Sequence, residues 1–384
     1  MIDSVLRDHL LALRRDLHRH PELSWQEHRT ADRVCEELDR IGVAYDRGVA
    51  GTGVVGHIPG PSGVPAIALR ADMDALPVTE ETGLPFASET EGVMHACGHD
   101  AHTAMVIGAA ELLARGEPLA TPVRLVFQPA EETGAGARAM IEAGVLDGVA
   151  QIFGGHVDRH YSTGTIVTHA GAVNASTDSF TIEIRGQGGH AARPHEGTDA
   201  VVIGALLVMS IQTIVSREIN PAHPSVVTVG RFDAGTASNV IAGRACLAGT
   251  VRAQDPAVRD HLLAALERMC QSIGQLHGAA IEIEIAEGTP ALINPPEMAS
   301  LAREAASLVV GAEHAVPLAV TNMGGEDFAY YLQHVPGCYV RFGAQVPGRE
   351  GYPAHSSRFD VDEAVLGIGA AYFAQVARIA GGKG

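Results

Sequence analysis

The order of its periodic segments constrains the fold of this chain more than any other feature of the sequence. In the first half, short apolar runs typical of buried strands alternate with segments whose apolar residues have helical spacing. The strands are expected at 53–57, 66–71 and 123–128, and the helices at 3–20, 29–41 and 101–115. This alternation predicts an α/β fold with a central, mostly parallel sheet and flanking helices.

From residue 179 the pattern changes to strand, helix, strand, strand, helix, strand, which is the order of the ferredoxin-like α+β unit. The strands are expected at 179–185, 226–232, 245–252 and 281–285, and the helices at 199–217 and 256–275. After Pro290 the α/β pattern resumes, with helices expected at 296–310 and 362–380. We therefore predict a discontinuous domain, residues 1–177 and 291–384, that carries an inserted domain at 178–290.

The charge of the chain excludes several classes of partner and of chemistry. It has 27 Lys+Arg against 45 Asp+Glu, which leaves a net charge of −18. A surface this acidic repels phosphate backbones and anionic membranes, so we expect neither nucleic acid nor a membrane as a partner. Lys383 is the sole lysine, which argues against a Schiff-base or phosphate-loop lysine. The 19 histidines and the carboxylates are therefore where chemistry is expected.

The cysteines and the first helix indicate a cellular location. Five cysteines at scattered positions are typical of reduced thiols rather than of a disulfide framework. The expected first helix, 3–20, is charged and amphipathic and has no apolar core like that of a signal peptide. We expect a cytoplasmic protein.

The segment His95–His102, HACGHDAH, is the most unusual stretch of the chain. Cys97 and His99 are two residues apart, so in extended backbone their side chains project to the same side. Thiolate and imidazole are good ligands for a borderline divalent metal. The alternative is a packed cysteine beside surface histidines, since a free cysteine usually behaves as a small apolar side chain. For His102 we favour a helix-facing side chain over metal ligation. The single tryptophan, Trp25, is assigned to packing.

Two more candidate sites follow apolar runs. Glu131 and Glu132 come after the expected strand 123–128, at the end of a strand where α/β sheets place their active sites. One carboxylate of such a pair can bind metal while the other handles protons, although a lone pair of this kind is more often a solvated turn. His156 follows the run Ile152–Gly155, and His355 lies in a loop before the last helix. Together with the Cys97–His99 pair, these segments supply five residues of ligand type on four loops, which is the number of ligands that two metal ions need.

Several motifs, taken together, resemble one protein family. They are HRHPELSWQE (18–27), LRADMDALPV (69–78), HACGHDAH (95–102), FQPAEETGAGA (127–137), GGHAARPH (188–195), TASNVI (236–241) and MGGEDFAYY (323–331). In this order they resemble the N-acyl-amino-acid amidohydrolases, such as hippurate hydrolase and indole-acetyl-amino-acid hydrolase, within the aminoacylase/carboxypeptidase family of two-metal hydrolases. The resemblance extends over about residues 5–378.

The resemblance implies a role for each matching residue. The ligands of two divalent ions, Mn or Zn with Ni or Co as further possibilities, fall on Cys97, His99, Glu132, His156 and His355. Cys97 matches a bridging thiolate and Glu131 the general base. His190 matches a residue that stabilises the oxyanion, reaching the site of a neighbouring subunit, and Asn239 and Arg252 match positions that bind the carbonyl and the carboxylate of the substrate. Asp74 matches a residue behind the ligands. The inserted domain is implied to be a lid and dimerisation domain, so we expect a homodimer.

The reaction implied is hydrolysis of the amide bond of an N-acyl-L-amino acid by a metal-held water, which gives a carboxylate and a free amino acid. A carboxypeptidase or dipeptidase would use the same site residues, and a catalytically silent binding module is a third alternative, disfavoured because it has no need of a two-metal site. The chain departs from the common motifs at Thr133 and around His160, which bears on substrate preference.

Overall fold

The computed structural model describes residues 2–348 and 351–382, which form two compact units. The main unit consists of Met1–Gly171, Ile293–Val320 and Asp327–Gly384, and the inserted unit of Ala172–Leu292 and Thr321–Glu326. The predicted insert, 178–290, lies within the inserted unit. That unit also includes 321–326, because Asn322 bridges to Asn174.

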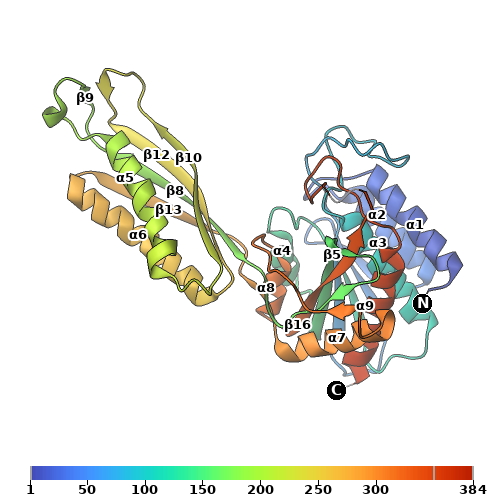
Figure 1. Cartoon of the computed structure of the whole chain (residues 1–384). Coiled ribbons are helices and arrows are strands. Elements are labelled where there is room, and N and C mark those ends of the chain that lie inside the picture. The colour runs from blue at the N-terminus through green and yellow to red at the C-terminus, as the bar shows by residue number, and fades with distance from the viewer. Residues whose placement is uncertain (1, 349–350, 383–384) are drawn as a thin grey trace. The chain divides into compact units, whose positions relative to one another are not determined.

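The main unit is built on an eight-stranded sheet of order β1-β2-β4-β3-β5-β16-β6-β15. Its central strands β4, β3, β5 and β16 are mutually parallel, while β1 and β2 add to one side as antiparallel strands. The strands are β1 (Ala44–Val49), β2 (Gly53–Ile58), β3 (Ala66–Asp72), β4 (Val123–Gln128), β5 (Val149–Ser162), β6 (Ile166–Val167), β15 (Ala315–Val316) and β16 (Gly337–Gln345). The predicted mostly parallel sheet with flanking helices is confirmed (Figure 1).

Helices of the main unit flank this sheet. They are α1 (Ser4–Arg19), α2 (His28–Ile41), α3 (His99–Arg115), α4 (Gly136–Glu142), α7 (Pro296–Val310), α8 (Phe328–Leu332) and α9 (Val365–Gly382). α3 is buried along most of its length, and α1, α2 and α9 pack around it. α3 and α9 approach closely at Gly108, where a Cβ would lie 2.7 Å from the Cβ of Ala370. The central helix that starts at the candidate site is thus held on several sides.

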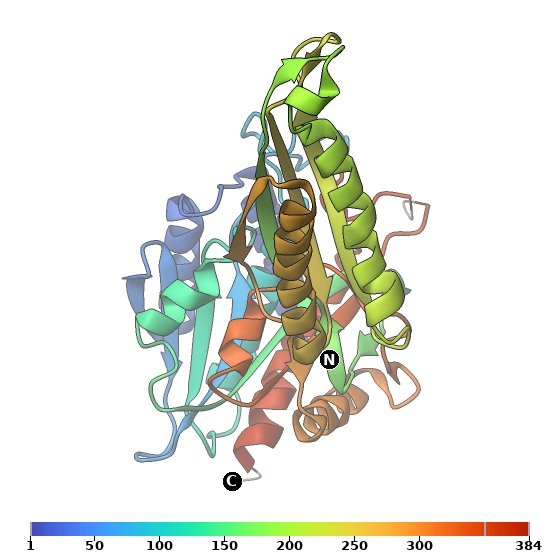
Figure 2. The ribbon, with the colours of Figure 1, turned by 90° about the vertical axis from the view of Figure 1, so that its left-hand side faces the viewer.

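The inserted unit is a four-stranded antiparallel sheet of order β10-β12-β8-β13, with α5 and α6 side by side on one face (Figure 2). Its elements are β8 (Ser176–Arg185), α5 (Ala200–Thr213), β10 (Ser225–Ala234), β12 (Arg244–Ala253), α6 (Pro256–His277) and β13 (Ala280–Glu287). Alternate strand residues such as Ile182, Ile184 and Leu247 are buried against the two helices. The predicted ferredoxin-like arrangement is confirmed.

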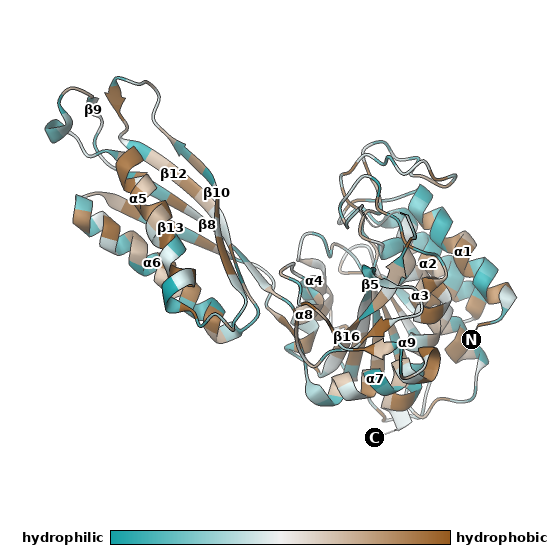
Figure 3. Cartoon of the chain, in the orientation of Figure 1, coloured by the Kyte–Doolittle hydropathy of each residue, from teal (hydrophilic) through white to brown (hydrophobic). Residues whose placement is uncertain are grey.

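Two helical stretches, Ala200–Glu218 and Val365–Gly382, are long and apolar enough to cross a membrane by length and composition alone. Val365–Gly382 is α9, most of whose residues are buried in the main unit. Ala200–Glu218, α5 with the π-helical turn Ile214–Glu218, buries one face on the inserted sheet and leaves apolar residues on the other (Figure 3). Core helices of folded domains pass the same test, so this composition is weak evidence for a membrane span.

Candidate metal centre

A glycine turn brings Cys97 and His99 together at the start of α3. Gly98 has φ +93°, a left-handed conformation that glycine adopts at no steric cost, and a Cβ on it would lie 2.5 Å from a methyl carbon of Val157. His99 is the first residue of α3. The helix thus starts two residues before the expected start at about residue 101, and the turn at Gly98, rather than extended backbone, brings the two side chains together.

His99 is fully buried and held by one of its two ring nitrogens. Its Nδ1 lies 2.9 Å from the backbone oxygen of Asp74 and 3.2 Å from Oδ1 of the same residue. Its Nε2 has no hydrogen-bond partner among the described residues. A buried nitrogen without a partner is what a metal ligand looks like in a protein without its ion, and the bond at Nδ1 fixes the ring in the orientation that presents Nε2.

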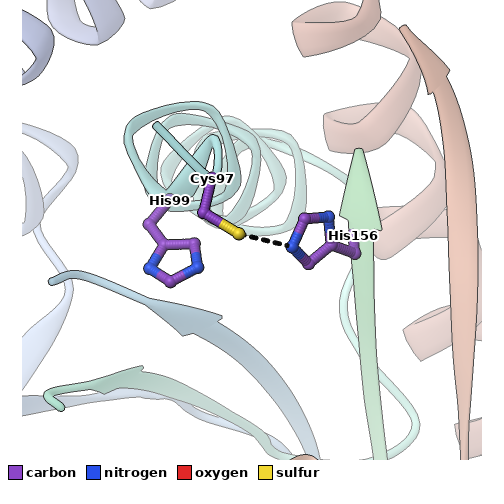
Figure 4. Close-up of side chains that lie close together, drawn as sticks. All are labelled: Cys97, His99 and His156. Atoms are coloured by element: carbon purple, nitrogen blue, oxygen red, sulfur yellow. Dashed lines mark hydrogen bonds between the residues drawn. The ribbon is translucent and has the colours of Figure 1, made fainter. Parts of the chain in front are cut away.

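His156 on β5 is arranged in the same way. Its Nδ1 donates to the backbone oxygen of Val157 at 2.7 Å, so the lone pair of Nε2 faces the Sγ of Cys97 at 3.2 Å (Figure 4). His102 lies behind it, with Nδ1 2.7 Å from Asp72 and Nε2 accepting the N–H of Val157 at 3.0 Å. Both nitrogens of His102 are thus engaged, and its ring packs edge-on against that of His156.

The turn after β4 supplies the carboxylates. Glu132 donates its backbone N–H to Oδ2 of Asp74 at 3.0 Å, and its buried Oε1 has no hydrogen-bond partner among the described residues. Its Oε2 lies 3.5 Å from Nε2 of His355, and Oε2 of Glu131 lies 3.9 Å from Nε2 of His99. Asp74 therefore orients both a histidine and a glutamate of the site, which agrees with its expected place behind the ligands.

Among the described residues, five triplets of possible donor atoms lie within 4.8 Å of one another, and three overlapping triplets consist of predicted residues alone. They are Cys97–His99–His156, Cys97–Glu132–His355 and His99–Glu131–Glu132. All six predicted residues of the main unit thus meet in one place from four separate segments, and Cys97 belongs to two of the triplets.

The electrostatics of the cluster favour a cation. Burial, with the charge of Glu132 beside it, raises the pKa of the Cys97 thiol, so a thiolate there needs a positive charge nearby. Burial opposes the charged form of His99, but Asp72 and the bond to Asp74 outweigh it and raise the pKa of His99 well above its usual value. Burial and the neighbouring His102 lower the pKa of His156 well below its usual value, which keeps that imidazole neutral as a ligand must be. A cluster of unpartnered N and O donors, a neutral imidazole and a thiol fits divalent metal ions.

The predicted substrate residues all belong to the inserted unit. His190 lies on the short strand β9 (Gly189–His190), paired with β11 (Val240–Ile241), and the backbone N–H of Ala191 donates to the oxygen of Asn239 at 3.1 Å. Both side chains are exposed. Arg252 is half-buried near the opposite end of β12, where its Nη1 donates to the backbone oxygen of Met323 at 2.8 Å. The structure thus brings His190 and Asn239 together and separates both from Arg252.

The two departures from the common motifs have local explanations. The Thr133 hydroxyl donates to the backbone oxygen of Ala130 at 3.0 Å and so closes the turn that contains Glu131 and Glu132. His160 is exposed and its Nδ1 lies 2.7 Å from Asp158.

Sequence reasoning missed the residues that support the cluster from behind. Arg70 is buried between Asp72, at 2.6 Å, and Asp327, at 2.8 Å. Ser24 donates to Oδ2 of Asp74 at 2.7 Å, and the buried Glu27 accepts the backbone N–H of Ala130 at 2.9 Å. The sequence signal that could have found them is the presence of charged residues, such as Arg70, Glu27 and Asp327, inside the family motifs. Trp25, assigned to packing, is 40% exposed, so it is only partly packed.

Comparisons with known proteins place this fold and cluster in one family. The model of peptidase family M20/M25/M40 matches residues 68–379. Thermostable carboxypeptidase 1 of Saccharolobus solfataricus is 40% identical over 372 residues, 95% of this chain and 93% of that protein. N-acetylcysteine deacetylase of Bacillus subtilis is 40% identical over 381 residues, 99% of this chain and 98% of that protein.

A solved structure agrees with these relatives. The YXEP protein of Bacillus subtilis, described as a dinuclear metal binding peptidase from the M20 family, superimposes with a TM-score of 0.87 at 37% identity, over 98% of this chain and 99% of that one. The chain belongs to peptidase family M20/M25/M40. This confirms the predicted family and the predicted class of enzyme, a metal-dependent hydrolase of amide bonds.

Proposed function

We propose that this protein hydrolyses N-acyl-L-amino acids to a carboxylate and a free amino acid, with two divalent metal ions held by Cys97, His99, Glu132, His156 and His355. The observation that carries the proposal is the meeting of five ligand-type side chains, two of which have a buried donor atom without a hydrogen-bond partner, beside a further carboxylate, Glu131. The relatives named as a deacetylase and as a metal-binding peptidase support it.

The ions, Mn or Zn in our proposal, would polarise the amide carbonyl and lower the pKa of water beside it. Glu131, which is not needed as a ligand, takes a proton as the oxygen of water forms a bond to the carbonyl carbon. It then gives that proton to the nitrogen as the C–N bond breaks. Asp74 and Val157 keep the ring nitrogens of His99 and His156 turned toward the centre throughout.

Recognition of the substrate is assigned to the inserted unit. Arg252 provides a guanidinium fork that matches the α-carboxylate of an amino acid, which an acidic protein must recognise with a local positive group. His190 and Asn239 are proposed to bind the carbonyl oxygen, where an N–H donor stabilises the developing oxyanion.

The spacing along β12 supports a homodimer. Arg244 pairs with Arg185 at one end of β12, close to His190, and Arg252 pairs with Thr177 eight residues away. At about 3.3 Å per residue this separates the two ends by about 25 Å, more than one small substrate can span. We therefore propose that His190 and Asn239 act on the site of a second copy of the chain, in a cytoplasmic homodimer.

The experiment is release of free amino acids from a panel of N-acyl amino acids and dipeptides, by chelator-stripped protein with Mn or Zn restored. Metal-restored cleavage of acyl amino acids supports the proposal. Cleavage of peptides alone would favour the second candidate, a carboxypeptidase, which the similarity to thermostable carboxypeptidase 1 suggests. Protein that holds no metal would favour a silent binding module.

The role of Glu131 is tested in the same assay with Glu131→Gln. This change keeps the shape but removes the proton acceptor, so we expect a fall in kcat of about 100- to 10,000-fold with full metal content. A fully active Glu131→Gln variant would contradict the assignment.

A further inference from the structure

Some of the strained backbone of this chain lies in the segments that meet at the candidate centre. Within residues 2–348 and 351–382, four non-glycine residues have positive φ: Trp25 (+67°), Ala50 (+52°), Ala130 (+54°) and His355 (+67°). His355 is a proposed ligand, and Ala130 directly precedes Glu131 and Glu132. Left-handed conformations of such residues persist only where neighbouring groups hold them.

One buried carboxylate holds two of these four residues. Oε1 of Glu27 accepts the backbone N–H of Trp25 at 3.0 Å and that of Ala130 at 2.9 Å. Oε2 accepts the hydroxyl of Thr52 at 2.6 Å. Glu27 is fully buried, although it lies outside the described metal cluster. A buried carboxylate is costly unless its oxygens are bonded, and here three donors share the two oxygens.

We propose that Glu27 is a positioning residue that fixes the turn of Glu131 and Glu132 by holding the strained backbone of Ala130 and Trp25. This inference rests on the proposed function, because it assigns the turn a catalytic role. A second bond acts on the same turn from the same segment, since Ser24 donates to Asp74 at 2.7 Å and Asp74 accepts the N–H of Glu132. The segment 24–27 thus supports the centre from two sides.

We expect the loss of the Glu27 carboxylate to change the conformation of the turn that contains Glu131 and Glu132. Without Glu27, the N–H of Ala130 is left buried without its acceptor, and a residue with φ +54° has less to hold it against relaxation to negative φ. Rotation at Ala130 redirects the next two side chains. Because a displacement of about 1 Å at reacting groups can cost about 100-fold in rate, the consequence should be a fall in kcat.

The decisive comparison is between Glu27→Ala, Glu27→Gln and Glu22→Ala, assayed with saturating metal on the best N-acyl amino acid of the panel. Glu22 is the matched control. It is a carboxylate of the same segment that also accepts two backbone N–H groups, those of Arg29 and Thr30, but at the start of α2. We expect Glu27→Ala to lower kcat about 10- to 100-fold with KM within about threefold, and Glu22→Ala to leave both unchanged.

Glu27→Gln distinguishes positioning from charge. The amide oxygen can accept both backbone N–H groups, and the amide nitrogen can donate to the hydroxyl of Thr52, so we expect kcat within about threefold of wild type. A fall as deep as that of Glu27→Ala, or an equal fall in Glu22→Ala, would overturn the proposal. If Glu27→Ala does not fold, Glu27→Asp withdraws the carboxylate by one methylene and should show the same lowered kcat at constant KM.

A second-site change tests the mechanism itself. Glycine adopts positive φ without strain, so Ala130→Gly in the Glu27→Ala background should recover part of the lost kcat. A double variant no better than Glu27→Ala would show that the backbone of Ala130 is not what Glu27 holds.

A readout without catalysis separates this proposal from the proposed function. Trp25 is the single tryptophan of the chain and one of the two residues that Glu27 holds, so its emission reports on whether the segment 24–27 keeps its conformation. We expect Glu27→Ala, but not Glu22→Ala, to shift the emission and to raise its quenching by acrylamide. Unchanged emission in Glu27→Ala would overturn the positioning role. If the emission shifts but wild-type protein cleaves nothing on the panel, the proposed function fails while the hold of Glu27 on Trp25 stands.

Discussion

The two units differ most in what they bury. In the main unit, Arg14, Arg70, Asp72, Asp100 and Asp327 are all at most 1% exposed, and each is bonded to an opposite charge or a polar group. The core of the inserted unit is aliphatic, with side chains such as Ile182, Leu207 and Leu266 fully buried. Of its proposed functional residues, His190 and Asn239 are exposed and Arg252 is half-buried. The main unit positions its functional groups with buried charged residues, whereas the inserted unit has an apolar core and exposes His190 and Asn239 at its surface.

The buried charges form chains that end at the candidate centre. Asp327 and Asp72 both bind Arg70, and Asp72 orients His102 against His156. On the other side of the centre, Asp100 accepts from Arg14 at 2.8 Å and lies next to His99 in sequence. Desolvation makes such pairs poor contributors to stability compared with apolar packing. The value of the pair Arg70–Asp72 is orientation, since Asp72 fixes His102, whose ring packs against His156.

The sharpest test of this contrast is Cys97→Ala against Cys338→Ala. Both thiols are buried, but Cys97 belongs to two donor triplets, while Cys338 lies in the sheet on β16. We expect Cys97→Ala to lower metal content and to lower activity by at least about 100-fold, because a direct ligand matters no less than the groups behind it. Cys338→Ala should keep metal and kcat. Elemental analysis measures the metal content and the amide assay measures the activity of both variants. Equal activity in the two variants would show that Cys97 is not a ligand of the centre.

The second test compares two arginines. Arg70→Met leaves Asp72 and Asp327 buried with a lost cation, so we expect a loss of about 3–5 kcal/mol in the free energy of unfolding. Arg259 of the inserted unit binds Asp178 through two bonds, at 2.7 and 2.9 Å, but its side chain is 18% exposed. Arg259→Met should therefore cost less. Denaturant unfolding of both variants measures this, and a larger loss for Arg259→Met would reverse the contrast between the units.

The sequence predicted the elements of both units better than it predicted what lies behind the site. Hydrophobic periodicity is local, so the alternating strands and helices of the main unit and the ferredoxin-like order could be read directly. The bond between Arg70 and Asp327 joins residues 257 positions apart, and no local sequence pattern predicts it. The turn at Gly98 was missed because two residues in C-x-H spacing fit a strand as well as a helix start.

The third test concerns the core of the inserted unit. Leu266 is fully buried on α6, while Leu276 on the same helix is 72% exposed. Leu266→Ala should cost about 2–5 kcal/mol through the lost packing and the cavity left behind. Leu276→Ala should stay within about 0.5 kcal/mol of wild type. Metal content should remain full in both, because the donor atoms lie in the main unit. Loss of metal in Leu266→Ala would show that the centre depends on the inserted core.

The smallest expected effect on stability tests the surface of the inserted unit. The outer face of α5 exposes Val202 and Met209, at 55% and 68%, and apolar exposure of this kind on neighbouring turns is typical of an interface. Met209→Glu should change the free energy of unfolding by no more than about 0.5 kcal/mol. If α5 contributes to the proposed homodimer, the same change lowers the mass seen by sedimentation. Because His190 is proposed to act on the site of the second copy, activity should fall with the dimer and recover at high protein concentration. A variant that becomes monomeric and stays fully active at every concentration would show that each chain completes its own site.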